Sequence, residues 1–201
     1  MINALGTWVL ENACKQLNLW QHKNVDITMH VNVAARQFFS GDLFEQVWDL
    51  LNRYRIKPKS LILEITETEL MGDIRYATNL CQELADLGVG IAIDDFGTGY
   101  SSLSYFKKLP ADELKIDKAF VLRMQQDKED QHMVDTIVRL AHHFNLKVVA
   151  EGVEDEVALS MLRELGCDYA QGFYFSKARD VIGLRDWLTD YARLNGHPPP
   201  G

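Results

Sequence analysis

The sequence predicts an α/β fold in which a curled parallel sheet lies inside a layer of helices. Short runs rich in Val, Ile and Leu alternate along the chain with longer segments whose apolar residues recur at helical spacing. Such an alternation is typical of parallel strands connected by covering helices. Several of the runs also end at polar side chains. The predicted strands are 26–33, 61–66, 113–117, 146–150 and 168–175, together with a run from residue 91 that ends in Asp94 and Asp95.

Helical periodicity fills the segments around these strands, and Gly and Pro mark their ends. Pro58 and Pro110 interrupt helical segments, because proline cannot continue a helix. Gly88 and Gly166 follow helical segments at the position where glycine commonly terminates a helix. The predicted helices are 2–17, 43–54, 70–87, 101–109, 133–144, 157–165 and 184–191. We expect one domain over residues 1–195, followed by a flexible tail at 196–201.

The composition is that of an ordinary globular domain, with 47% hydrophobic and 25% charged residues among 201. The net charge of -8 argues against binding to a DNA or RNA polymer, although it permits a small anionic ligand held by a metal. The three cysteines are far apart and lack metal-binding spacing, which predicts reduced thiols in a cytoplasmic protein. No apolar run approaches the roughly 20 residues that span a bilayer.

Asp94 and Asp95 are the most informative pair in the chain. They follow an apolar run and precede a glycine-containing loop. A strand interior does not tolerate two unpaired charges, so the pair must lie where the strand emerges from the core. Adjacent carboxylates there suit a divalent metal. The alternative is a turn with two solvated acids.

Five other predicted strands also carry polar side chains near their C-terminal ends. These residues, with the aspartate pair, are Asn32, Glu64, Asp94, Asp95, Lys115, Glu151 and Gln171. In a parallel barrel, the C-terminal ends of all strands open onto one face, which carries the active site. The barrel would therefore gather residues that are scattered along the sequence.

The gathered side chains favour metal-assisted chemistry on a phosphate. Asn32, Glu64, Asp94 and Asp95 offer hard oxygen ligands for Mg²⁺ or Mn²⁺, and Ca²⁺ also fits. Two carboxylates at one strand end can bridge two metals about 3.5–4 Å apart, as in phosphodiester hydrolysis. Lys115 would face the acids and complement a phosphate or position a water. Glu151 is a candidate general base or a further metal ligand.

Each candidate also has a structural alternative. Asn32 is suited to capping a turn, and acids of the segment 64–69 are suited to the first turn of a helix. Lys115 and Asp117 are spaced for a surface ion pair. Gln171 could be a polar residue of the sheet whose side-chain hydrogen bonds are satisfied there. The aromatic residues 173–175 favour the core over a ligand platform.

Six motifs occur in order over nearly the whole chain. They are 32–38 (NVAARQF), 63–67 (LEITE), 94–103 (DDFGTGYSSL), 114–117 (LKID), 149–154 (VAEGVE) and 171–177 (QGFYFSK). Together they closely resemble the EAL domain, the bacterial cyclic-di-GMP phosphodiesterase.

The resemblance implies a TIM-barrel-like (βα) repeat and hydrolysis of cyclic-di-GMP to linear pGpG by a metal-activated water at a two-metal site. It implies that Mg²⁺ or Mn²⁺ supports turnover, whereas Ca²⁺ binds without supporting it. Asn32, Glu64, Asp94, Asp95 and Glu151 match the metal ligands.

The resemblance also assigns other roles within the site. Glu151 and Lys115 match the catalytic residues, with Lys115 holding the nucleophilic water. Gln171 and Glu154 match site residues that we group, with Asp117, as substrate-binding. Glu67 matches the residue that anchors the loop 96–102, which the family links to metal binding and dimerisation.

Several features depart from the family pattern. This chain contains no Glu-Ala-Leu sequence and shows six of the eight strands expected for the barrel, without the N-terminal hairpin. We therefore expect open sheet edges near 26–33 and 168–175, and self-association that sedimentation would detect. The alternative to an active enzyme is a catalytically impaired EAL domain that acts as a cyclic-di-GMP receptor or regulatory interaction module.

The family also implies partners and a location. We expect cyclic-di-GMP as the ligand, a homodimer or other self-association, and a sensory or GGDEF domain upstream in a longer parent protein. The expected location is cytoplasmic, although the parent could be anchored in a membrane.

Overall fold

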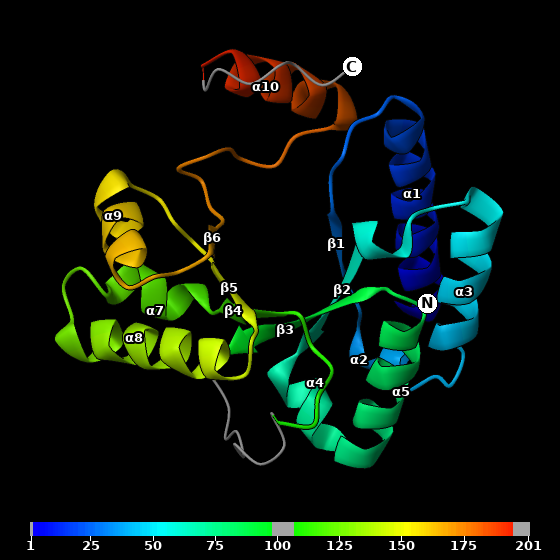
Figure 1. The fold of residues 1–201 in the computed structure, drawn as a ribbon, viewed down its shortest axis with the longest axis horizontal. Coiled ribbons are helices and arrows are strands. Elements are labelled where there is room, and N and C mark those ends of the chain that lie inside the picture. The colour runs from blue at the N-terminus through cyan, green and yellow to red at the C-terminus, as the bar shows by residue number, and fades with distance from the viewer. Residues whose placement is uncertain (1, 98–106, 195–201) are drawn as a thin grey trace.

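The computed structural model describes residues 2–97 and 107–194, with the side chains of 192–194 left aside, and it contains a single curled sheet (Figure 1). Six strands pair in parallel in the order β1-β2-β3-β4-β5-β6. They are β1 (Met29–Asn32), β2 (Leu61–Thr66), β3 (Gly90–Phe96), β4 (Glu113–Ile116), β5 (Lys147–Ala150) and β6 (Tyr169–Ala170). The predicted α/β barrel-like repeat with six strands is confirmed, and β1 and β6 are the edges of the described sheet.

Helices precede, connect and follow the strands. They are α1 (Ile2–His22), α2 (Ala35–Phe38), α3 (Leu43–Tyr54), α4 (Glu67–Gly72), α5 (Ile74–Asp86), α7 (Lys118–Arg123), α8 (Lys128–His143), α9 (Glu156–Glu164) and α10 (Val181–Leu194), with a 3₁₀ turn η1 at Pro58–Ser60. Helices α1, α3 and α5 lie beside the first strands, and α7, α8 and α9 lie beside the last (Figure 1). Most of the predicted short helix at 101–109 falls outside the described residues. No helix in the described ranges combines the length and hydropathy of a bilayer span.

The two faces of the sheet differ in chemistry. Side chains such as Leu63, Ile93 and Val148 point outward into the main hydrophobic core with the helices. Successive residues of a strand point to opposite faces, so the positions between them line the inside of the curl. That inner surface carries Glu64 on β2 and both Glu113 and Lys115 on β4. The fold therefore buries apolar side chains outside the sheet and gathers polar ones inside it.

The last strand is shorter than the sequence predicts. We predicted a strand over 168–175, but regular pairing covers Tyr169–Ala170. Beyond it the chain turns, with Val153 N–H donating to the carbonyl of Gln171 and Tyr174 N–H donating to the carbonyl of Val153. A side chain at Gly172 would place its Cβ 2.1 Å from the Val153 carbonyl oxygen, so glycine is what lets the two segments touch. This backbone contact between loops has no periodic signature in the sequence.

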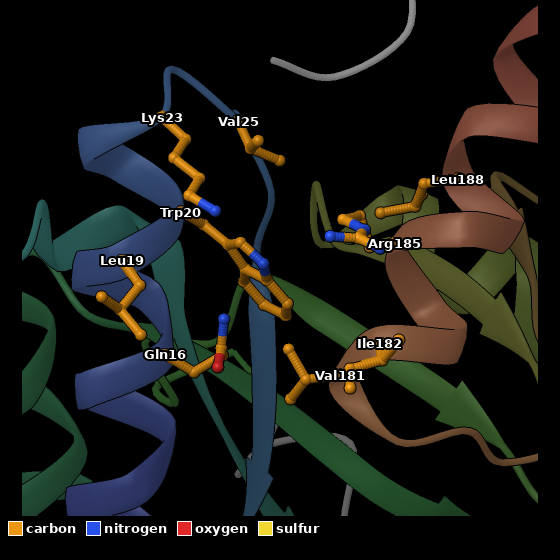
Figure 2. Close-up of a pocket in the computed structure, with 9 residues that line it drawn as sticks. All are labelled: Gln16, Leu19, Trp20, Lys23, Val25, Val181, Ile182, Arg185 and Leu188. Atoms are coloured by element: carbon orange, nitrogen blue, oxygen red, sulfur yellow. The ribbon is translucent and has the colours of Figure 1, made fainter.

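A small cavity lies between α1 and α10 and contains none of the candidate acids (Figure 2). Trp20 and Leu19 of α1 line one side, and Val181 and Leu188 of α10 line the other. Lys23 and Arg185 are at its margin. Since its walls are mainly apolar and carry no anionic oxygen, this cavity does not suit a divalent cation.

Asp168 secures the opposite, N-terminal end of the last strands. Its carboxylate accepts hydrogen bonds from Lys147 Nζ at 2.6 Å, His142 Nε2 at 2.8 Å and Val148 N–H at 3.0 Å. Burial alone would raise the pKa of Asp168, but these bonds outweigh it and lower the pKa from 3.8 to about 2.

We expect Asp168→Asn to destabilise the fold by about 1–2 kcal/mol at neutral pH, a value reduced for the exposure of its partners. Because the folded pKa is depressed, this stabilisation is complete above pH 4 and is lost as the pH falls from about 4 towards 2. Urea unfolding of both proteins between pH 7 and pH 3 measures it. A difference in stability that stays constant over this range would contradict the assignment.

Candidate metal and catalytic site

A bulge in β3 brings the two adjacent aspartates to one site. Ile93 pairs with Leu114 and Phe96 with Ile116, so Asp94 and Asp95 together face the single intervening residue of β4. Asp95 has a left-handed φ of 54°, which Asp adopts more readily than most residues. Neighbouring side chains of a regular strand would point to opposite faces, and the extra residue removes this constraint. Oxygens of Asp94, Asp95 and Glu151 consequently lie within 4.8 Å of one another.

Lys115 occupies the centre of the acidic cluster. Its Nζ lies 2.6 Å from Glu151 Oε1, 2.8 Å from Glu64 Oε1 and 3.1 Å from Asp94 Oδ1, and its side chain is 3% exposed. Glu64 and Lys115 are separated by β3, where the in-register residue beside Glu64 is the small Ala92. This small side chain and the curl of the sheet let the ammonium group reach across the inner face.

The alternative of a surface ion pair between Lys115 and Asp117 is wrong. Lys115 is buried among the three other carboxylates, whereas the Asp117 side chain caps α7 by accepting from Ala119 N–H. Burial disfavours the charge on Lys115, but hydrogen bonds and Coulomb attraction from Glu151 and Glu64 outweigh burial and raise its pKa. The ammonium group is therefore held in its charged form.

The carboxylates around it differ in their affinity for protons. Burial would raise the pKa of Glu64, but hydrogen bonds from His30 and Lys115 outweigh it and lower the pKa. For Glu151, burial outweighs the bond from Lys115, and the pKa is raised. The pKa of Asp95 is also raised, first by burial and then by the charges of Asp94 and Asp117. The surroundings thus favour the ionised form of Glu64 and make the Glu151 carboxylate easier to protonate than an ordinary glutamate.

The acids of the segment 64–69 divide between two roles. Glu64 lies within β2 and faces the cluster, so its alternative as a helix first-turn acid is wrong. Glu69 does serve the helix, forming a capping box with Thr66 at the start of α4. Glu67 Oε2 accepts from Gly97 N–H at 3.1 Å, which connects α4 to the start of the glycine loop. Residues 98–102 of that loop lie outside the described residues.

The remaining predicted residues surround the cluster, and their side chains make no hydrogen bond or ion pair to it among the described residues. Asn32 is exposed and pairs in register with Glu64. Gln171 is also exposed, and its backbone N–H donates to the carbonyl of Ala150, next to Glu151. Glu154 is exposed on the loop that follows β5. Their roles as ligands of metal or substrate stay predictions.

Two polar residues of this inner face were missed in the sequence. His30 Nδ1 lies 3.0 Å from Glu64 Oε1, and His30 Nε2 lies 3.8 Å from Glu113 Oε2. The available signal was spacing, because His30 precedes Asn32 by two residues and Glu113 precedes Lys115 by two, and such pairs share a strand face.

The donor set fits a hard divalent cation. Asp94, Asp95 and Glu151 offer oxygen atoms close together. Glu64 is a fourth carboxylate nearby, since it contacts the same Lys115 ammonium group. Four carboxyl groups surround one ammonium group, so acidic groups outnumber the lysine cation in the cluster. Mg²⁺ and Mn²⁺ prefer such oxygen ligands.

Comparisons with known proteins give a consistent result. A family model described as EAL domain matches residues 1–178. The signaling protein YkoW of Bacillus subtilis is 41% identical over 177 residues, which are 88% of this chain and 22% of that protein. MucR of Pseudomonas aeruginosa, named a bifunctional diguanylate cyclase/cyclic di-GMP phosphodiesterase, is 44% identical over 178 residues, which are 88% of this chain and 26% of that protein.

A solved structure agrees with these sequence matches. The PaMucR phosphodiesterase in a c-di-GMP complex superposes with a TM-score of 0.89 at 43% identity, covering 91% of this chain and 74% of that one. The chain thus spans about a quarter of the length of the curated relatives that it matches.

Proposed function

Because this chain belongs to the EAL domain family, we propose that it hydrolyses cyclic-di-GMP to linear pGpG with the help of divalent cations. The observation that carries the proposal is the contact of Lys115 with Glu151, Glu64 and Asp94 beside the paired aspartates. An acid of raised pKa, a buried cation and an all-oxygen donor set on one inner face suit hydrolysis of a phosphodiester.

The proposed ligands of Mg²⁺ or Mn²⁺ are Asn32, Glu64, Asp94, Asp95 and Glu151. When bound, a divalent cation supplies positive charge beside the phosphodiester oxygens and lowers the pKa of a water molecule. The excess of acidic groups over the lysine cation favours cation binding, and the bulge at Asp94 and Asp95 supplies two ligands from one strand.

Glu151 and Lys115 are the proposed catalytic residues. The raised pKa of Glu151 makes its carboxylate a stronger base than an ordinary glutamate. It is therefore suited to accept the proton of the attacking water. Lys115 holds Glu151 Oε1 at 2.6 Å, and its positive charge attracts an oxygen of the water or the phosphate. Glu67 anchors the beginning of the glycine loop through Gly97 N–H. Gln171, Glu154 and Asp117 are the proposed substrate contacts.

The test is to incubate the protein with cyclic-di-GMP and Mg²⁺ or Mn²⁺ and to follow pGpG by chromatography. Losing a residue that hydrogen-bonds to a metal ligand typically lowers metal affinity or activity 10–100-fold. We therefore expect Asp94→Ala, which removes a ligand itself, to lower turnover by at least about 100-fold. The control is Asp49→Ala, since Asp49 is exposed on α3 and pairs with Arg53.

Each outcome of this assay has a distinct meaning. Turnover that depends on Asp94 supports the enzyme. Binding of cyclic-di-GMP without pGpG supports the alternative, an impaired EAL domain acting as a receptor or regulatory module. If Asp94→Ala leaves both binding and turnover unchanged, the proposed metal site is wrong.

Partners and location extend the proposal. Self-association is a further prediction, since β1 and β6 are the edge strands of the described sheet and an unpaired edge offers hydrogen bonds to another chain. A sensory or GGDEF domain in a longer parent protein is in keeping with the greater length of the relatives. A cytoplasmic location also stays a prediction.

A further inference from the structure

His30 stands between two acids on the inner face of the sheet. Its Nδ1 atom lies 3.0 Å from Glu64 Oε1, and its Nε2 atom lies 3.8 Å from Glu113 Oε2. A carboxylate has no hydrogen to donate when ionised, so Nδ1 carries the proton of the bond to Glu64. The imidazole thus connects an acid of the proposed metal site to an acid outside it.

These contacts span most of the curled sheet. His30 belongs to β1, Glu64 to β2 and Glu113 to β4. Neighbouring strands are about 4.8 Å apart, so β1 and β4 would be about 14 Å apart in a flat sheet. The 3.8 Å approach of His30 to Glu113 therefore depends on the curl. The contact ties an edge strand to the interior of the sheet.

Glu113 places an unpartnered carboxylate oxygen beside the imidazole. Its Oε2 atom is buried and has no hydrogen-bond partner among the described residues. The nearest basic group in the described structure is the imidazole of His30, whose Nε2 atom lies 3.8 Å from this oxygen. At 3.8 Å this contact is too long for a hydrogen bond, and Nε2 attracts the oxygen when the ring carries a proton on both nitrogens. The ring thus lies between two acids, although its side chain is 31% exposed.

Two nitrogen atoms contact the same oxygen of Glu64 in the described structure. His30 Nδ1 and Lys115 Nζ lie 3.0 Å and 2.8 Å from Oε1. Two donors on one carboxylate oxygen set the rotation of the whole group, because the second oxygen must point away from both. Oε2 would then be the atom available to a cation.

We propose that His30 is a positioning residue that, braced by Glu113, orients Glu64 for metal binding. The inference rests on the proposed function, since it takes Glu64 as a metal ligand. It adds a residue outside the motifs that identify the family, and it gives the histidine no direct role in the reaction.

Mn²⁺ affinity, measured by titration calorimetry without any nucleotide, tests this role. Residues that orient metal ligands typically contribute 10–100-fold to affinity. We expect His30→Ala to weaken Mn²⁺ binding by about tenfold. His30→Asn places its amide nitrogen near the position of Nδ1 and should restore most of the affinity. His30→Gln places its amide near Nε2, towards Glu113, and should bind as weakly as His30→Ala.

The controls separate positioning from folding and from catalysis. His132→Ala, on the exposed side of α8, should bind Mn²⁺ like the wild type. Circular dichroism and thermal unfolding establish that each variant folds; if His30→Ala does not, the comparison of His30→Asn with His30→Gln decides.

Three outcomes overturn the inference: wild-type affinity in His30→Ala or His30→Gln, equal weakening in Asn and Gln variants, or a wild type that binds no Mn²⁺. A wild type that binds Mn²⁺ but releases no pGpG would instead contradict the proposed function, while the ranking of the His30 variants still tests the positioning role.

Discussion

Lys115→Met is expected to destabilise the metal-free protein by about 3–5 kcal/mol, the usual cost of removing one partner from a buried ion pair. The ammonium group contacts Glu64, Asp94 and Glu151, and its side chain is 3% exposed. Methionine fills a similar volume but leaves three carboxylates without their cation. Urea unfolding in the presence of a chelator measures the difference in the free energy of unfolding.

The same variant provides a second observation. Mn²⁺ should recover part of the lost stability, because a bound cation neutralises the carboxylates that Lys115 no longer contacts. The matched control is Lys147→Met, whose lysine is 60% exposed and pairs with Asp168. Exposed pairs contribute about 0.2–1 kcal/mol, so this control should change stability little. A loss below 1 kcal/mol in Lys115→Met would show that the buried network does not stabilise the fold.

Glu151→Gln is expected to lower the turnover of cyclic-di-GMP by about 10²–10⁴-fold, the range for loss of a general acid or base. The amide keeps the shape of the side chain but cannot accept the proton of the attacking water. It also weakens the proposed metal site, where Glu151 lies with Asp94 and Asp95. Turnover at saturating Mn²⁺ and substrate separates the loss of the base from the loss of metal affinity.

Glu164→Gln is the matched control for this experiment. Glu164 is exposed at the end of α9 and takes no part in the acidic cluster. It should retain the activity of the unchanged protein. Retention of more than a tenth of the turnover in Glu151→Gln would exclude Glu151 as the general base and leave it as a metal ligand at most.

Local patterns predicted most of the architecture. Apolar runs separated by helical segments indicated six parallel strands, because strand and helix periods differ and are legible within short windows. The acidic pair after residue 93, the lysine at 115 and the acids at 64 and 151 were expected to meet because parallel strands end on one face. The structure confirms that Lys115 faces Glu64, Asp94 and Glu151.

Features that depend on contacts between distant segments were not predictable in this way. The sixth strand was expected to extend through Phe175, but the approach of Gly172 to Val153 turns the chain after Ala170. The bulge at Asp94 and Asp95 depends on how β3 pairs with β4, a register that neither strand specifies alone. His30 and Glu113 carried a strand-face signal, yet nothing local indicated that β1 and β4 approach each other.

The sequence by itself therefore determined the order of strands and helices and the polar side chains that the strand ends carry, since each follows from local periodicity and residue type. The tertiary structure alone decided the distances among those side chains. Curling the sheet brings β1, β2 and β4 within side-chain reach, and the bulge lets two adjacent aspartates serve one site. Both are properties of strands packed together, so they are absent from any single segment.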